Sequence, residues 1–208
     1  LMRHSHVALM TDDIYEHIRY DGREFVTALQ LEPALRDRTL LVNGVSKAYA
    51  MTGWRIGYGA GPAPLIRAMI KLQSQSTSNP CSVSQMAAIA ALTGPQASVR
   101  ANTAILERRR DYVHDALNAI AGISSHKPEG AFYAFPSCER LLGKRTAMGK
   151  AIETSHDFVL HLLETQNLAA LPGSAYGIEG YFRLSFATSM TELTEGCSRI
   201  ARACAELT

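Results

Sequence analysis

The amino-acid sequence predicts an α/β part followed by a smaller α+β part, with the boundary near residue 100. Short apolar runs bounded by turn residues recur in the first part, helical periodicity dominates the middle, and strand-like alternation appears towards the end. The chain has 208 residues, of which 47% are hydrophobic and 19% are charged. This composition is typical of a soluble globular protein.

Three apolar runs in the first part predict inner strands of a mostly parallel or mixed sheet. Each run ends at residues that favour turns, namely Asp, Asn, Gly or Pro. The runs cover residues 7–10 (V-A-L-M), 39–42 (T-L-L-V) and 54–60 (W-R-I-G-Y-G-A).

Helices are expected to follow these strands. Residues 63–75 carry apolar side chains at helical spacing. Ser82 and Gln85 predict a capping box at the start of an alanine-rich helix that stops at Gly94. A long amphipathic helix is expected from about residue 96 to 121.

The last third of the sequence changes to strand-like alternation. Residues 131–135 and 181–187 alternate in the way that half-buried strands do. Helices are expected at about 155–166 and 190–206. The intervening segment 138–154 is polar and without a pattern, so we expect a surface loop.

The charge distribution points away from nucleic acids and membranes. The formal net charge is only +2, and no polybasic patch is evident. The one dense basic run, Arg108-Arg109-Arg110, lies between Glu107 and Asp111 and is interpreted as the solvated face of a helix. No apolar run approaches the roughly 18 residues that a membrane span needs, and no signal peptide is visible.

The cysteines and histidines do not indicate a metal site. The four cysteines, at positions 81, 138, 197 and 204, form no C-x-x-C pair, so neither a zinc site nor a disulfide framework is expected. Reduced thiols favour a cytoplasmic protein. His4 and His6 have no third ligand nearby. The chain opens L-M-R-H-S-H and runs directly into a strand-like segment, so we expect that an N-terminal part is missing.

Lys47 is the first candidate for chemistry. It lies in the stretch N-G-V-S-K-A-Y-A-M (residues 43–51), where its neighbours are small or apolar. Partial desolvation disfavours the charged form of an amine and makes it nucleophilic, and such a lysine can form a Schiff base. The alternative is an ordinary solvated lysine that follows a strand.

Three further residues are candidates, and each is ambiguous alone. Arg55 lies in a segment expected to be extended and glycine-rich, where it could clamp a phosphate or form an ordinary salt bridge. Asp12 ends a predicted inner strand, where α/β sheets place ligands, but it could equally be a turn or cap residue. Arg183 lies in an alternating strand and could receive a carboxylate or be structural.

Taken together, these segments resemble a known family. Residues 44–57 (G-V-S-K-A-Y-A-M-T-G-W-R-I-G) closely resemble the pyridoxal-phosphate lysine signature of class I aminotransferases. The resemblance covers essentially the whole chain, as the C-terminal half of such an enzyme, and is closest to the bacterial aspartate aminotransferase branch. Further matching segments are T-D-D-I-Y-E (11–16), S-T-S-N-P (76–80), P-E-G-A-F-Y-A-F-P (128–136) and Y-F-R-L-S-F-A-T-S (181–189).

The resemblance implies a fold and a cofactor. Residues 1–100 would be part of the large α/β domain that binds pyridoxal 5'-phosphate, with its N-terminal portion missing. Residues 101–208 would be the small α+β domain, including the long connecting helix. Lys47 would hold the cofactor as a Schiff base and move the proton at the substrate Cα as a general base and acid.

The remaining roles are also implied by the resemblance. Asp12 would pair with the pyridine nitrogen and keep it protonated, and Tyr15 would donate a hydrogen bond to the ring oxygen. Arg55, helped by Ser46, would bind the cofactor phosphate. Arg183 would bind the α-carboxylate of the substrate through a two-pronged pair.

This sequence departs from the family pattern at two places. Position 44 is Gly, whereas some relatives carry Ser there as a phosphate ligand. The segment 73–77 (Q-S-Q-S-T) lacks the Arg with which one branch recognises a distal carboxylate. The N-terminal half of the family supplies further cofactor contacts and a tyrosine across the dimer, so we expect this chain alone to bind the cofactor weakly and to lack useful activity.

The expected function is transfer of the amino group of L-aspartate to 2-oxoglutarate by a full-length homodimer. One alternative is an aminotransferase for aromatic substrates or prephenate, because close relatives share these motifs. A second is the effector-sensing domain of a transcription regulator, which would require a DNA-binding module upstream. A third is a non-catalytic fragment.

Overall fold

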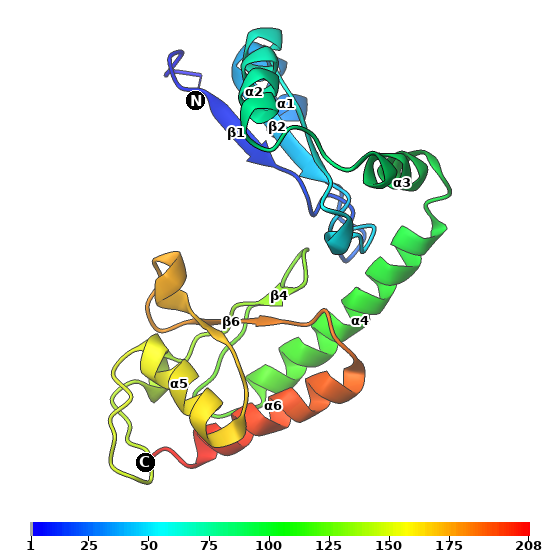
Figure 1. The fold of residues 1–208 in the computed structure, drawn as a ribbon. Helices are drawn as coiled ribbons and strands as arrows, with labels where there is room; N and C mark the ends of the chain where they lie inside the picture. Colours follow the sequence, from blue (N-terminus) through cyan, green and yellow to red (C-terminus); the bar gives the residue numbers. More distant parts are fainter. Residues whose placement is uncertain (1) are drawn as a thin grey trace. The chain divides into compact units, whose positions relative to one another are not determined.

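The computed structural model describes residues 2–208, which divide into two compact units (Figure 1). The first unit ends at Thr103 and the second runs from Ala104 to Thr208. Each unit contains a three-stranded sheet together with helices. The chain is therefore of the α/β class, as the sequence predicted.

The first unit is built on a mixed sheet in the order β1-β2-β3. Strands β1 (Leu9–Asp12) and β2 (Thr39–Gly44) are parallel, and β3 (Gly57–Ala60) is antiparallel to β2. Only β2 is an inner strand of this described sheet. The prediction of inner strands was therefore wrong for β1 and β3, whose backbones are paired on one side only and whose residues are partly or fully exposed.

Helices α2 and α3 of the first unit lie where the sequence predicted them, whereas α1 and the 3₁₀ helix η1 were not predicted. The box predicted from Ser82 and Gln85 is wrong, because Ser82 is already helical, Cys81 is the N-cap, and Gln85 Nε2 donates to Pro80 O. A capping box does form at Thr27, with Gln30 as its partner. The helical segments are α1 (Ala28–Leu31), the 3₁₀ helix η1 (Pro33–Arg38), α2 (Ala63–Ser76) and α3 (Ser82–Thr93).

A small apolar core lies directly beside the stretch that carries Lys47. Val45, Ile56 and Ala88 are buried there, and Tyr49 and Met51 pack against them. Val45 comes from the end of β2 and Ala88 from α3, so this core joins the sheet to a helix. Burial of these side chains fixes the backbone on both sides of Lys47.

The second unit has a short antiparallel sheet in the order β4-β6-β5. Two of its strands are shorter than the sequence suggested: β4 is Tyr133–Ala134 and β6 is Phe182–Ser185. The third strand, β5 (Leu171–Pro172), was not predicted. Three helices complete the unit: α4 (Ala97–Asn118), which begins in the first unit, α5 (Ser155–Gln166) and α6 (Met190–Ala205). In Figure 1, α6 lies along α4, and residues of both helices line one cavity.

The core of the second unit is large and aromatic. Phe158 on α5 and Phe182 on β6 are both fully buried and meet edge to face, with their ring centroids 5.2 Å apart. A capping box of Thr154 and Asp157 starts α5. Burial of such rings contributes about 1.5–3 kcal/mol each, so this packing holds β6 firmly.

Two expectations about the surface were wrong. The segment 138–154 is not simply a surface loop, because Cys138, Leu141 and Ile152 are buried, and Glu139–Leu141 form the 3₁₀ helix η3. Arg110 is likewise not solvated, since its side chain is only 1% exposed. In both cases a few residues turn inward from a segment whose average composition is polar.

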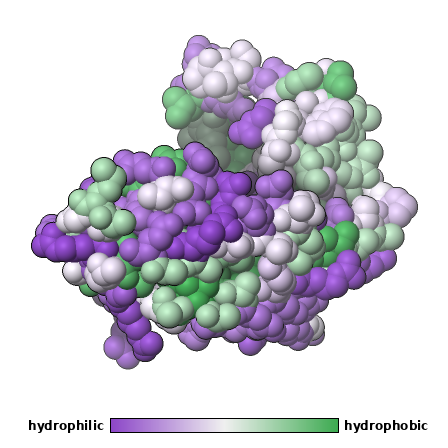
Figure 2. Space-filling model, turned by 90° about the horizontal axis from the view of Figure 1, so that it is seen from below, coloured by the Kyte–Doolittle hydropathy of each residue, from purple (hydrophilic) through white to green (hydrophobic). Residues whose placement is uncertain are grey.

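The exterior is otherwise of mixed hydropathy. Figure 2 shows hydrophilic side chains over much of the visible face, interrupted by smaller hydrophobic areas. Among the described residues, no helix is long and apolar enough to cross a membrane, and no group of three potential metal ligands occurs. All four cysteines are free, and only Cys81 is exposed.

Candidate functional site

Lys47 lies in the turn that directly follows the inner strand β2. The backbone contact from Val45 N to Ile56 O, at 3.4 Å, continues the β2–β3 ladder by one step. Lys47 O then accepts a hydrogen bond from Ala50 N at 3.1 Å and so begins a tight turn. Lys47 itself is half-buried, between the buried residues Val45 and Ala48. Partial desolvation of the Lys47 amine stays a prediction.

Arg55 lies shortly before β3, and Ser46 lies shortly after β2. The ladder between these two antiparallel strands ends at the pair of Gly44 and Gly57. Both residues named as phosphate ligands are therefore within two residues of the same end of the strand pair. Arg55 is exposed, and its Nη1 donates to Thr52 O at 3.0 Å.

The expected extended conformation of Arg55 was wrong. Thr52–Trp54 form a 3₁₀ turn (η2), and Arg55 closes it in the left-handed region, with φ 55° and ψ 47°. Its backbone N–H donates to Thr52 O at 3.4 Å. An arginine in this conformation is uncommon, and here the turn directs the chain back into β3.

Gly44 is constrained by the neighbouring strand. A Cβ at this position would lie 2.9 Å from Ile56 O and 3.2 Å from the Cα of Gly57. The serine that some relatives carry here would require β3 to shift. Glycine therefore fits the close approach of β2 and β3 in this chain.

Asp12 and Tyr15 follow β1 at the same edge of the sheet. Asp12 is the last residue of β1 and pairs with Val42 of the parallel strand β2. Its side chain is exposed, and its Oδ1 accepts a hydrogen bond from Ile14 N at 3.4 Å. Tyr15 is half-buried in the next turn. Because parallel strands end at one edge, the segments that carry Asp12 and Lys47 both leave the sheet on this side.

Three polar residues around this edge were not predicted from the sequence. Asp13 is buried, and burial, followed by repulsion from Glu16, raises the pKa of its carboxyl. Glu16 accepts a hydrogen bond from Asn43 Nδ2 at 2.7 Å, which ties the turn after β1 to the end of β2. The sequence marked Asn43-Gly44 as a turn signal. It gave no sign that Asn43 is hydrogen-bonded to Glu16, which lies 27 residues earlier.

Arg183 belongs to the second unit and lies on its middle strand. Tyr133 pairs with Ser185, so Tyr133 and Arg183 are diagonal neighbours on one face of the sheet. The Cζ atom of Arg183 lies 4.5 Å from the ring centroid of Tyr133 and 4.9 Å from that of Tyr176. The sequence pointed to Arg183 but not to these two rings.

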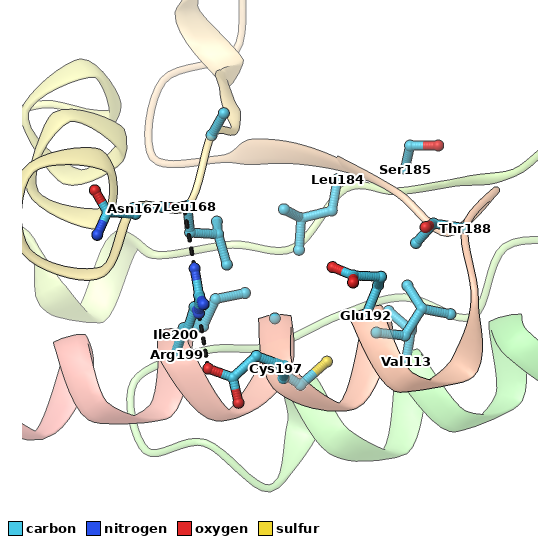
Figure 3. Close-up of a pocket in the computed structure, with 14 residues that line it drawn as sticks. Val113, Asn167, Leu168, Leu184, Ser185, Thr188, Glu192, Cys197, Arg199 and Ile200 are labelled. Atoms are coloured by element: carbon cyan, nitrogen blue, oxygen red, sulfur yellow. Dashed lines mark hydrogen bonds and ion pairs between the residues drawn. The ribbon is translucent and has the colours of Figure 1, made fainter.

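A cavity of about 330 Å³ in the second unit is not part of this arrangement (Figure 3). Leu184 points into it, whereas Ser185 points the other way. Strand alternation places Arg183 on the side opposite Leu184. Two charged groups of the cavity are engaged with each other, because Arg199 Nε contacts Glu195 Oε1 at 2.8 Å, and Arg199 Nη1 also donates to Asn167 O at 3.3 Å.

The polar groups of the first unit suit a phosphorylated aromatic aldehyde. An amine, a carboxylate, a phenol, a hydroxyl and a guanidinium are gathered on the segments that leave one edge of the sheet. The amine can bond an aldehyde, the carboxylate can pair with a ring N–H, and the guanidinium can hold a phosphate. The residues are Asp12, Tyr15, Ser46, Lys47 and Arg55.

Comparisons with known proteins identify a family for this chain. A family model for aminotransferase class I and II matches residues 1–200. The aspartate aminotransferase of Rhizobium meliloti (strain 1021) is 57% identical over 207 residues, which are 100% of this chain and 50% of that protein. A probable aspartate/prephenate aminotransferase of Rickettsia bellii is 53% identical, over 100% of this chain and 52% of that protein.

Solved structures give the same result. The crystal structure of the R. meliloti aspartate aminotransferase matches with a TM-score of 0.97 and 56% identity, over 100% of this chain and 52% of that one. An aromatic aminotransferase from Pyrococcus horikoshii matches with a TM-score of 0.88 and 35% identity, over 99% of this chain and 53% of that one. The chain thus spans about half the length of the curated relatives it matches.

Proposed function

Because this chain belongs to the aminotransferase class I and II family, we propose that the whole protein transfers the amino group of L-aspartate to 2-oxoglutarate. The observation that carries this proposal is the position of Lys47, half-buried in the turn after β2. The match to an aspartate aminotransferase at 57% identity supports the choice of substrate. We also propose that the protein acts in the cytoplasm as a homodimer.

The two units have natural counterparts under this proposal. The first would be the C-terminal part of the large cofactor-binding domain, and the second would be the small domain. The mixed sheet of the first unit, with its polar groups at one edge, supports the first assignment.

The proposed cofactor is pyridoxal 5'-phosphate, which when bound supplies an electron sink for the charge that develops at the substrate Cα. Asp12 would hold the proton on the ring nitrogen, and Tyr15 would donate to the ring oxygen. Arg55 and Ser46 would bind the phosphate, which their positions at the same end of the β2–β3 strand pair support. A bidentate contact from Arg55 suits this task because a guanidinium matches the geometry of phosphate oxygens.

Lys47 would be both the anchor and the proton carrier. Its amine would hold the cofactor between turnovers, remove the proton from the substrate Cα, and return a proton later in the reaction. The residue is half-buried in this turn. Arg183 would hold the α-carboxylate and so orient the Cα–H bond for this transfer.

A second candidate substrate class is supported by the relatives. The R. bellii relative is named a probable aspartate/prephenate aminotransferase, and the P. horikoshii structure is an aromatic aminotransferase. Transfer to prephenate or to an aromatic oxo acid is therefore the alternative. Comparison of kcat/KM for oxaloacetate, 2-oxoglutarate, prephenate and phenylpyruvate decides between the two.

The proposal is tested on Lys47 in a cofactor-loaded enzyme that contains this chain. Borohydride should attach the cofactor irreversibly to Lys47, and mass spectrometry of the peptides locates the adduct. Lys47→Ala should abolish both the adduct and turnover, because no other amine occupies that turn. Lys71→Ala, at an exposed position on α2, is the matched control and should change neither. An adduct elsewhere, or turnover in Lys47→Ala near that of the parent enzyme, would refute the proposal.

A further inference from the structure

The guanidinium of Arg183 is in contact with two tyrosine rings that come from different elements. Tyr133 is on β4, and Tyr176 is the last residue of the 3₁₀ helix η4 (Gly173–Tyr176). The Cζ atom of Arg183 lies over both rings, at 4.5 and 4.9 Å from their centroids. Both distances are within the range in which a cation is attracted to an aromatic face.

Both rings are themselves supported by other aromatic side chains. Phe135 meets Tyr176 edge to face, with centroids 5.9 Å apart at 86°. The same Phe135 stacks on Tyr181 at 5.5 Å and 12°. Phe132 contacts Tyr133 at 4.9 Å. Each ring beside Arg183 is therefore in contact with one further aromatic ring.

Arg183 makes no ion pair and no side-chain hydrogen bond within residues 2–208, and its guanidinium contacts these two rings. The side chain is half-buried. Contact with ring faces leaves the N–H groups at the edge of the guanidinium for a planar anion. An arginine held only by aromatic faces is thus restrained in direction but not neutralised.

We propose that Tyr133 and Tyr176 are positioning residues that hold Arg183 ready for the carboxylate of the substrate. The inference rests on the proposed function, in which Arg183 binds that carboxylate. A free arginine side chain loses rotational freedom when it binds, whereas two ring contacts restrict it beforehand. The rings also exclude water from the faces of the guanidinium, which strengthens a charged pair at its edge.

The test uses a cofactor-loaded enzyme that contains this chain, with succinate as a non-reacting dicarboxylate. Calorimetry gives the Kd for succinate, and steady-state kinetics give KM and kcat for L-aspartate. Tyr133→Leu and Tyr176→Leu should each raise Kd and KM about fivefold, as expected for loss of one cation–ring contact, with kcat changed less than twofold. Tyr133→Phe and Tyr176→Phe keep the ring face and should bind within twofold of the parent enzyme.

Two controls separate positioning from general damage. Tyr112→Leu removes a half-buried tyrosine of α4 that does not touch Arg183, and it should leave the Kd for succinate unchanged. Thermal unfolding reports whether each variant is folded. Tyr176 is 44% exposed, so its leucine variant should fold even if Tyr133→Leu does not, and its result then decides the proposal.

The outcomes distinguish this inference from the proposed function. If Arg183→Ala binds succinate as the parent enzyme does, the role of Arg183 is wrong and the positioning role is wrong with it. If Arg183→Ala weakens binding but the leucine variants do not, only the positioning role is overturned. The positioning role is also overturned if the phenylalanine variants bind succinate as weakly as the leucine variants do. That result would assign the effect to the tyrosine hydroxyl groups and not to the ring faces.

Discussion

Arg110 lies in a run of three arginines, yet it is almost completely buried while Arg108 is exposed. A helix turns about 100° per residue, so positions 108 and 110 point to very different sides of α4. Arg110 Nη1 donates to Pro128 O at 3.1 Å, and its Nη2 contacts Asp111 Oδ1 at 2.8 Å. Local composition could not reveal this, because Pro128 arrives from a distant segment.

Removal of Asp111 should destabilise the protein more than removal of Arg110. Asp111→Ala removes the carboxylate at 2.8 Å from a buried guanidinium, which keeps its contacts with Glu107 Oε1 at 3.6 Å and Pro128 O at 3.1 Å, so a loss of about 2 kcal/mol is expected. Arg110→Met keeps the packing and leaves a half-exposed Asp111 still paired with Lys127 at 2.8 Å, so a loss of about 1 kcal/mol is expected. Urea unfolding of both variants measures the two values, and a reversed order would contradict the argument.

The same pair should make the protein more sensitive to acid. Desolvation acts to raise the pKa of Asp111, but hydrogen bonds from Lys127 and Arg110 outweigh it, and the net result is a lowered pKa. Because the folded-state value is the lower one, the contribution of Asp111 is complete above the usual carboxyl pKa and is lost as the pH falls through the lowered value. Asp111→Ala should therefore flatten the acid limb of the stability profile.

At the scale of elements, segments with local start and stop signals were predicted best. The ends of α5 match the sequence-based range, because Thr154 with Asp157 caps its start and Asn167 adopts the left-handed conformation at its end. Strands β4 and β5 have two residues each and exist only through pairing with β6. Such pairing depends on contacts between residues that are distant in the sequence. The sequence-based prediction therefore overestimated the length of β4 and missed β5.

The turn after α4 depends on Gly122 for two separable reasons. Its φ is +87°, and a Cβ would lie 2.4 Å from Leu141 Cδ2, which is buried. Gly143 has the same φ of +87°, but a Cβ added there would have no neighbouring atom within 4 Å. Gly143→Ala should cost about 1 kcal/mol from strain alone, whereas Gly122→Ala should cost about 1–3 kcal/mol more from overpacking. Equal losses in urea unfolding would rule out the packing contribution.

At the scale of the whole molecule, large apolar side chains remain exposed along two helices of the first unit that follow each other in the sequence. These residues are Leu65, Met69, Ile70 and Leu72 on α2 and Val83, Met86, Ile89 and Leu92 on α3. The α-helices of the second unit have fewer such exposed side chains, namely Ile105 on α4, Leu163 on α5 and Met190 on α6. The order of the motifs along the sequence was sufficient to name the candidate site residues, because each motif is local. The rings that surround Arg183 required the pairing of three strands and could not be found that way.

The 208-residue chain alone should bind pyridoxal phosphate weakly and show no useful transamination. It spans about half the length of its relatives, and the family resemblance assigns further cofactor contacts to the other half. Titration of cofactor absorbance and a coupled assay with L-aspartate and 2-oxoglutarate measure the two properties. The complete R. meliloti enzyme is the positive control, and robust turnover by this chain alone would contradict the expectation.

Arg183 lies on β6, which is hydrogen-bonded to a neighbouring strand on each side. The rings beside it come from a two-residue strand and a short 3₁₀ helix at the margins of the same sheet. Substitutions at positions 133 and 176 therefore change the surroundings of Arg183 without changing the central strand. In a redesign for a different carboxylic acid, libraries at positions 133 and 176 should retain more folded members than libraries on β6 itself.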